Sequence, residues 1–164
     1  MKDKKFHTSF FNLHPLTLLV ELSCKSEYAI LALLEMASYY QNGEPLQIRQ
    51  IAAQQNIPDR YLEQLLATLR RGGIVKSQRG SKGGYLLARE PRKITILEIL
   101  ECLEGLDVRI CEENINPRTV DSSVVDDIWQ EACQAANLVL QNYTLQDLCE
   151  KRDSRRQLDI MYYI

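Results

Sequence analysis

Histidine is nearly absent from this sequence: it has two, His7 and His14, and both precede the first predicted helix. The rest of the chain therefore lacks the commonest general base in catalysis and a common ligand for metal ions. The sequence also has no recognisable nucleophile motif, no paired carboxylates in a known pocket motif, and no G-x-x-x-x-G-K-[ST] phosphate loop. These absences predict that the protein is not an enzyme.

Cysteine is present, but its pattern excludes a disulfide framework. The number is odd, the spacing is wide and no C-x-x-C pair occurs among Cys24, Cys102, Cys111, Cys133 and Cys149. This pattern predicts a reducing compartment, the cytoplasm. All except Cys111 fall in or beside predicted helices, where we expect them to be buried as small apolar side chains.

Long hydrophobic runs are also missing. Residues 1–19 start basic and become moderately apolar, but Glu21 follows soon and no small-residue cleavage site marks a secretion signal. We therefore expect no membrane partner. We expect residues 1–19 to be a tail with little structure, and an alternative translation start at Val20.

The composition is that of a globular protein, with 45% hydrophobic and 26% charged residues in 164. The formal net charge of -2 hides an asymmetry along the chain. Residues 70–93 contain eight basic residues and one acidic residue, whereas residues 94–164 contain six basic and fourteen acidic residues. A basic centre suggests a local surface for an anionic partner, although a merely solvated face has the same charge pattern.

Hydrophobic periodicity predicts that the basic centre follows a group of three helices. The expected helices span 26–40, 48–55 and 59–71, with Ser23 or Ser26 capping the first and Asp59 the third. A change of period then predicts two strands, 74–79 and 85–88, around a glycine-rich turn. Three more helices are expected at 95–103, 123–143 and 145–152.

These elements predict a mainly α fold with a small β-hairpin wing, a winged helix-turn-helix. We divide the chain into a tail, a winged helix-turn-helix domain, a linking helix with an effector loop, and a dimerisation helix with a C-terminal helix: 1–19, 20–93, 94–122 and 123–164. The predicted loop 106–122 is longer than compact domains usually tolerate, which favours a functional role.

The second helix of a helix-turn-helix enters the major groove of DNA. If the leucines of helix 59–71 face the core, Arg60, Glu63 and Gln64 face outward. These side-chain types pair with guanine, cytosine and adenine respectively. Arg79 and Lys82 lie among the glycines of the hairpin tip, where glycine lets the backbone approach phosphate or a narrow groove. An ordinary long hairpin loop is the alternative interpretation of this tip.

The helix at 123–143 has an apolar seam that predicts dimerisation. Small residues in the seam would let a second helix approach closely. The predicted dimerisation residues are Val125, Ile128, Trp129, Ala132, Ala136, Val139 and Tyr143.

Several short motifs resemble the Rrf-type family of bacterial winged-helix transcription regulators. They are the run from Ser23 to Ala29, Y-L-E-Q-L beginning at Tyr61, and R-G-x-x-G-G-Y beginning at Arg79. The resemblance covers residues 21–148 and implies a homodimer that binds double-stranded DNA at a pseudo-palindromic site. With the outward-facing residues above, it gives the predicted DNA-binding set Arg60, Tyr61, Glu63, Gln64, Arg70, Arg79, Gly80, Ser81, Lys82, Gly83, Gly84 and Tyr85.

The sequence departs from the cluster-binding members of this family, which carry C-x5-C-x5-C and, in the iron–sulfur regulator, a histidine three residues further. The corresponding positions here are Cys111, Pro117, Ser123 and Asp126. Proline cannot ligate iron through its side chain, and serine is a poor substitute for a thiolate. The resemblance therefore implies no standard iron–sulfur cofactor and leaves Cys111 as the effector candidate.

Three modes of regulation stay open. The signal is a small molecule or a regulatory protein, with Cys111 redox-active or irrelevant; or an irregular iron–sulfur cluster uses Cys111 and other thiols; or the protein is a repressor without an effector. A second class of function is a protein-interaction module that has lost DNA binding. The retained basic wing argues against that class.

Overall fold

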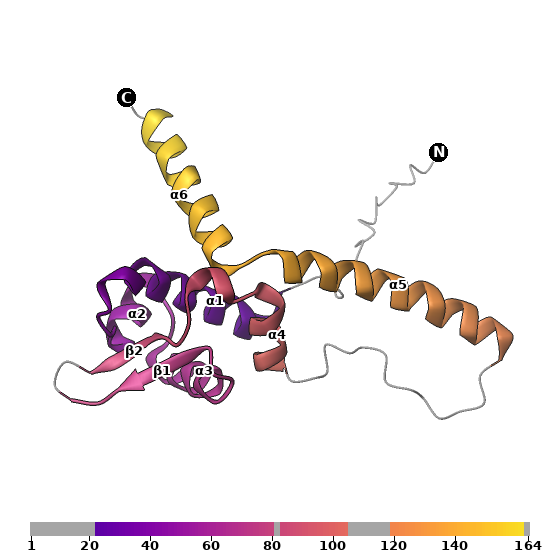
Figure 1. Cartoon of the computed structure of the whole chain (residues 1–164), viewed down its shortest axis with the longest axis horizontal. Helices are drawn as coiled ribbons and strands as arrows, with labels where there is room; N and C mark the ends of the chain where they lie inside the picture. Colours follow the sequence, from indigo (N-terminus) through magenta and orange to yellow (C-terminus); the bar gives the residue numbers. More distant parts are fainter. Residues whose placement is uncertain (1–21, 81–82, 105–118, 163–164) are drawn as a thin grey trace, which may run out of the picture.

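The computed structural model describes residues 22–80, 83–104 and 119–162. Its elements are α1 (Cys24–Ser38), the 3-10 helix η2 (Tyr40–Asn42), α2 (Ile48–Gln55), α3 (Asp59–Arg71), β1 (Val75–Gln78), β2 (Gly84–Leu87), the 3-10 helix η3 (Pro91–Lys93), α4 (Ile96–Glu104), α5 (Val120–Asn142) and α6 (Leu145–Tyr162). Figure 1 shows α1 to α4 and the hairpin gathered in one body, from which α5 and α6 project in different directions.

Helix α1 lies at the centre of the core, because it packs against α2, α3, α4 and α6. Its inward residues include Ala29 and Ala32, both fully buried, whose small side chains let neighbouring helices approach. The other helices contribute mainly leucine and isoleucine, among them Ile51, Leu62, Leu66, Leu69 and Ile99. These apolar residues recur every three or four positions, which explains why these segments fold as amphipathic helices.

Helices α2 and α3 form the predicted helix-turn-helix, and both have the predicted bounds. The C-cap of α2 is Asn56, which has a left-handed backbone (φ 53°), and the buried Ile57 follows. The prediction that Asp59 caps α3 is wrong. The N-cap is Pro58, without a side-chain hydrogen bond, and Asp59 is the first helical residue, where its charge favours the positive end of the helix.

Strands β1 and β2 form an antiparallel hairpin in which Lys76 lies opposite Leu86 and Gln78 opposite Gly84. Strand β1 is shorter than the predicted 74–79, whereas β2 has the predicted length and begins one residue earlier than the predicted 85–88. Leu46, in the connection between α1 and α2, extends this sheet by one isolated bridge to Tyr85. The two residues exchange backbone hydrogen bonds of 2.9 and 2.8 Å. This backbone pair joins the wing to the helix-turn-helix.

The start of α4 holds the junction between α5 and α6. The Ile96 N–H donates to the Tyr143 carbonyl at 2.9 Å, and the Leu145 N–H donates to the Ile94 carbonyl at 2.8 Å. Leu145 is fully buried in the core. Helix α5 is therefore attached near its C-terminal end, and it contains no buried residue.

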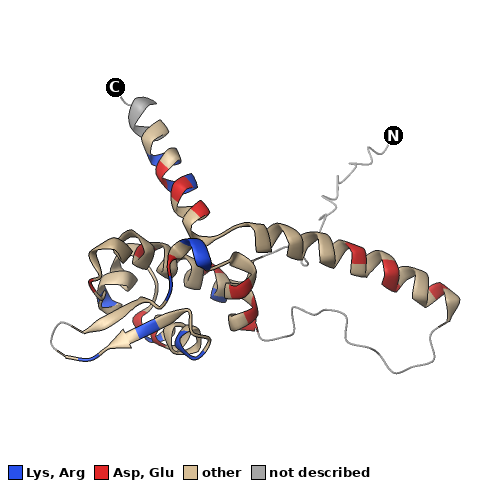
Figure 2. Ribbon diagram, viewed as in Figure 1, with Lys and Arg blue, Asp and Glu red and all other residues tan. Residues whose placement is uncertain are grey.

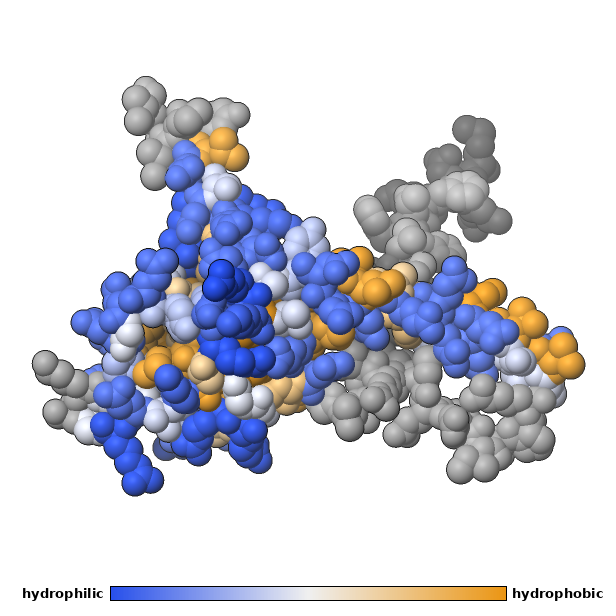
Figure 3. Space-filling model, viewed as in Figure 1, coloured by the Kyte–Doolittle hydropathy of each residue, from blue (hydrophilic) through white to orange (hydrophobic). Residues whose placement is uncertain are grey.

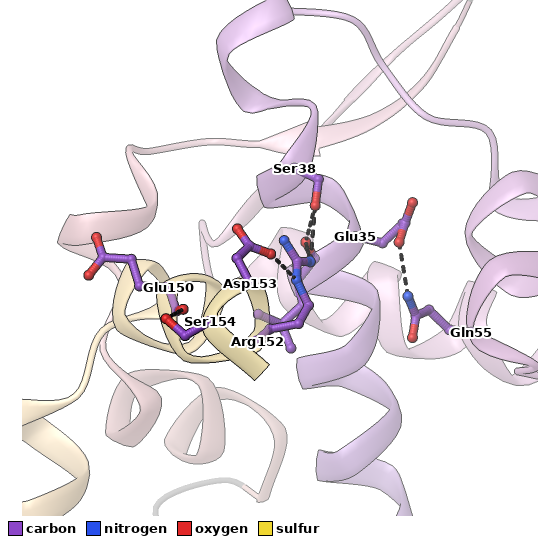
Figure 4. Close-up of polar contacts among 8 residues, drawn as sticks. Glu35, Ser38, Gln55, Glu150, Arg152, Asp153 and Ser154 are labelled. Carbon is purple, nitrogen blue, oxygen red and sulfur yellow. Dashed lines mark hydrogen bonds and ion pairs between the residues drawn. The ribbon is translucent and has the colours of Figure 1, made fainter. Parts of the chain in front are cut away.

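Helix α6 is much longer than the predicted 145–152. Arg152 fastens it to α1: its Nη1 donates to the Leu34 carbonyl at 3.3 Å and to the Ser38 hydroxyl at 3.0 Å (Figure 4). Within the described residues, no helix is long and apolar enough to cross a membrane.

Other differences from the sequence predictions are local. Helix α1 starts at Cys24, two residues before its predicted start, and Ser23, one of the two predicted caps, is its N-cap. Cys24 is exposed rather than buried. The last residues of the predicted loop 106–122 are helical, because the Thr119 hydroxyl caps α5 by accepting from the Ser122 N–H at 3.2 Å. The predicted tail 1–19 and the remainder of that loop up to residue 118 lie outside the described residues.

Candidate DNA-binding surface

The outer face of α3 presents three polar side chains to solvent. Arg60, Glu63 and Gln64 are exposed, whereas the leucines of the opposite face are buried. Tyr61 lies differently: it is half-buried, and its ring makes an edge-to-face contact with Tyr28 at 5.9 Å between centroids. Among the described residues, Arg60, Glu63 and Gln64 have no side-chain partner, so these side chains are available for base recognition.

The wing is tied to the C-terminal turn of α3. Arg70 is exposed, and its Nη1 donates to the Ser77 hydroxyl of β1 at 3.3 Å. Arg79 is exposed at the end of β1. The predicted residues Ser81 and Lys82 lie outside the described residues.

Backbone conformation and close packing explain why glycine occupies positions in the wing. Gly80 has a φ of 115°, which side chains rarely adopt. A Cβ on Gly83 would lie 2.4 Å from the Gln78 carbonyl oxygen, and one on Gly84 would lie 2.3 Å from the Leu46 carbonyl oxygen. Tyr85 is half-buried beside them. Close backbone packing therefore accounts for Gly83 and Gly84 without any contact to DNA.

Charge is distributed unevenly over these elements. Figure 2 shows acidic residues along α4 and α5 and basic residues on the hairpin. Arg49, which is not among the predicted residues, is a further exposed basic residue on α2, the helix that precedes α3. It is the one basic residue of α2 and lies outside the apolar set of that helix, a signal that could have identified it.

A family model described as "Iron-dependent Transcriptional regulator", Rrf2, matches residues 22–151. The chain belongs to the Rrf2 family. The HTH-type transcriptional regulator CymR of Bacillus subtilis is 33% identical over 147 residues, which cover 88% of this chain and 100% of CymR. The HTH-type transcriptional regulator IscR of Yersinia enterocolitica is 31% identical over 135 residues, 82% of each chain.

Solved structures agree with this Rrf2 assignment. T. potens IscR has a TM-score of 0.67 at 33% identity and covers 80% of this chain and 88% of its own. The structure of CymR, the global cysteine regulator of B. subtilis, has a TM-score of 0.68 at 33% identity and covers 80% of this chain and 97% of the CymR chain. These likenesses confirm the winged helix-turn-helix fold. The protein is a helix-turn-helix transcriptional regulator, and its relatives are named as regulators rather than enzymes.

The family description "Iron-dependent" implies ligands for iron. Of the positions that correspond to the cluster cysteines, Cys111 and Pro117 lie outside the described residues, and Ser123 lies in the first turns of α5. Within the described residues, no three histidine, cysteine or acidic side chains come together as a metal site. The donor set does not fit a three-cysteine cluster, because one position is proline and another is serine.

Helix α4 of this Rrf2 regulator packs against α3 and ends directly before residues 105–118. The Cys102 thiol lies 3.6 Å from the Thr68 carbonyl oxygen, and a Cβ on Gly72 would lie 2.3 Å from its Sγ. Burial and the nearby Glu98 carboxylate raise the pKa of Cys102, so its thiol stays protonated at neutral pH. Cys102 therefore serves as packing between α3 and α4 rather than as a reactive thiolate.

The last residue of α4 is bound to the start of α1. The Glu104 carboxylate accepts hydrogen bonds from the hydroxyls of Ser23 and Ser26, both at 2.7 Å, and lies 3.8 Å from the Lys25 ammonium. The hydroxyls of Ser23 and Ser26 are the main cause of the lowered pKa of Glu104. This cluster fixes the end of α4, immediately before residues 105–118.

We expect this carboxylate to make stability depend on pH. The pKa of Glu104 is lower in the folded than in the unfolded chain. The carboxylate therefore contributes its full share to the free energy of unfolding above pH 4.5, and this share is lost as the pH falls through the lowered folded pKa. Glu104→Gln should reduce the urea midpoint at neutral pH and flatten its fall at acid pH. Glu101→Gln, on the exposed side of α4, is the control. Equal acid sensitivity of the Glu104→Gln variant and the wild type would contradict this assignment.

Proposed function

We propose that this Rrf2 regulator is a homodimer that binds double-stranded DNA at a pseudo-palindromic operator. The carrying observation is the exposed outer face of α3, with Arg60, Glu63 and Gln64 in the positions that read base edges in a helix-turn-helix. The wing is joined to α3 by the hydrogen bond from Arg70 to Ser77, and it carries the exposed Arg79 directly after β1. Such an arginine would contact phosphate or a narrow minor groove.

The exposed side chains of α5 support the homodimer. The helix has no buried residue, yet it exposes large apolar side chains: Val124 at 54%, Val125 at 67%, Ile128 at 66%, Leu138 at 60% and Val139 at 55%. Figure 3 shows hydrophobic residues along its length. An exposed apolar stripe of this kind typically marks a protein interface. A second copy supplies the same stripe, and two copies present two recognition helices to the two halves of a palindrome.

The other residues of the predicted seam fit this interface in different ways. Ala132 and Ala136 are exposed and small, and Trp129 is half-buried. Tyr143 lies at the attached end of α5, where the Lys151 ammonium lies 3.9 Å from the ring centroid. Tyr143 thus belongs to the junction with α6 as well as to the seam.

We further propose that this regulator works without the standard iron–sulfur cluster and that a small molecule or a partner protein provides its signal. The proline and serine at two cluster positions support this proposal. Protein purified without oxygen should be colourless and contain no stoichiometric iron or sulfide, and it should still bind DNA. Visible absorption with stoichiometric iron would instead favour an irregular cluster that includes Cys111.

The test of DNA binding uses two alanine variants and fluorescence anisotropy on operator fragments selected from random DNA. Arg79→Ala should weaken binding to all sequences and reduce its salt dependence, because it removes a phosphate contact. Gln64→Ala should weaken binding by about 1–3 kcal/mol on the best site and relax the preference at one base pair, because it removes a base contact.

Arg156→Ala, exposed on α6, is the matched control and should change neither property. If the wild type selects no sequence, or if neither variant differs from it, the surface does not read DNA. The protein-interaction module is then the better account of this chain.

A further inference from the structure

A cavity of about 340 Å³ lies between the α1–α2 connection and the β-hairpin. Its floor is formed by the buried side chains of Met36, Leu46 and Leu87. No described residue of α3 lines it, so it is separate from the base-reading face. Cavities of roughly 300–1,000 Å³ with an apolar floor and a few polar groups are typical of small-molecule sites.

The rim of this cavity carries one charge of each sign. Glu44 comes from the α1–α2 connection and Lys76 from β1, and both are exposed. They form no ion pair with each other or with any other described residue. Tyr39, Tyr40 and Tyr85 also line the cavity.

This combination matches a ligand that has both an ammonium and a carboxylate group. Glu44 can accept hydrogen bonds from an ammonium, which tyrosine ring faces also attract. Lys76 can donate to a carboxylate. DNA phosphate is a poorer occupant, because it would meet Lys76 but would be repelled by Glu44.

The size and the floor limit the rest of the ligand. A cavity near the lower end of the range for ligand sites suits one small metabolite rather than a nucleotide or a folded peptide. Because the floor consists of the buried residues Met36, Leu46 and Leu87, a ligand held by the two rim charges would place an apolar group against it. We propose that this cavity is an effector site for a free amino acid with an apolar or aromatic side chain.

The position of the cavity gives such a ligand a route to the wing. The two residues that exchange backbone hydrogen bonds, Leu46 and Tyr85, both line it. A ligand held by Glu44 on one side and Lys76 on the other spans the same joint between the helix-turn-helix and the hairpin. Binding therefore restrains the hairpin relative to α3. Because a restrained wing loses less freedom on DNA, the ligand should strengthen DNA binding. This coupling rests on the proposed DNA-binding function.

The first experiment measures ligand binding without DNA. L-leucine, L-methionine and L-phenylalanine are each compared with their N-acetyl and amide forms by thermal shift and calorimetry on the full chain. At least one free amino acid should bind and raise Tm, whereas its two derivatives, which each lack one charge, should not. Glu44→Gln and Lys76→Met should each weaken that binding about tenfold or more, as expected for loss of a charged hydrogen-bond partner.

Glu101→Gln and Arg156→Met, which remove exposed charges elsewhere, are the controls and should bind the amino acid as the wild type does. Both cavity variants should fold normally, because the replaced side chains are exposed and unpaired among the described residues. The proposal is overturned if none of the three amino acids binds, if the blocked derivatives bind equally well, or if the cavity variants bind like the wild type.

The second experiment measures DNA affinity with and without the bound amino acid. The ligand should tighten operator binding by the wild type about tenfold, within the usual range for allosteric coupling, and leave Glu44→Gln unchanged. Ligand binding with unaltered DNA affinity would overturn the effector role. If the protein binds no DNA at all, the proposed function fails, while the first experiment still decides whether the cavity is an amino-acid site.

Discussion

Ile128→Asp is expected to convert the protein to a monomer and to weaken operator binding by at least about 100-fold, because linked binding of two half-sites is lost. Ile128 is 66% exposed in the single chain, at the middle of the apolar face of α5. A carboxylate buried there between two copies would lose its hydration without gaining a partner. Light scattering after gel filtration measures the mass, and anisotropy measures the affinity.

The core of the single chain should tolerate this change, because α5 contains no buried residue. Gln130→Asp adds the same group two positions further, on the opposite side of the helix, and is the matched control. It should remain dimeric and bind DNA normally. A dimeric Ile128→Asp variant would mean that two copies associate through another surface.

The bounds of α2 and α3 could be predicted from the sequence because both helices are amphipathic and have sharp ends. The buried leucines of α3 repeat at helical spacing, and the segment from Asn56 to Pro58 interrupts the chain before it. Since the buried face determines the exposed face, the sequence also predicted that Arg60, Glu63 and Gln64 are exposed.

The length of α6 could not be predicted in this way, because residues beyond 152 show little apolar periodicity. Arg155, Arg156 and Gln157 are good helix formers, and a tertiary contact supports the helix before them: Arg152 binds the Leu34 carbonyl of α1. Such a contact joins residues 118 positions apart, which no local pattern reveals.

The contact between the wing and the helix-turn-helix could not be predicted from the sequence either. The sequence predicted a hairpin, but the pairing of Tyr85 with Leu46 depends on how the α1–α2 connection packs beside β2. The cavity rim has the same origin, because Glu44 and Lys76 are brought together by that pairing. The sequence predicted that Gly84 lets the backbone approach DNA, whereas the structure explains this glycine by the short distance to the Leu46 backbone.

Gly84→Ala is expected to detach the wing while leaving the helices folded. The new Cβ would lie 2.3 Å from the Leu46 carbonyl oxygen and 2.6 Å from its carbon, both backbone atoms that no side-chain rotation can move away. The chain must therefore break or lengthen the hydrogen bonds between Leu46 and Tyr85. We expect a loss of about 1–3 kcal/mol in the free energy of unfolding, the usual cost of overpacking. DNA affinity should fall as well, because Arg79 loses its fixed position.

The stability measurement separates this cause from a direct role of Gly84 at DNA, because it is made without DNA. Gln78→Ala is the matched control: Gln78 is the cross-strand partner of Gly84, so alanine there occupies the same rung of the hairpin without approaching Leu46. It should unfold at nearly the wild-type urea concentration. If Gly84→Ala were as stable as the wild type but failed to bind DNA, glycine would be required at this position by contact with DNA. A loss in both properties means that the wing acts through its attachment to the helix-turn-helix.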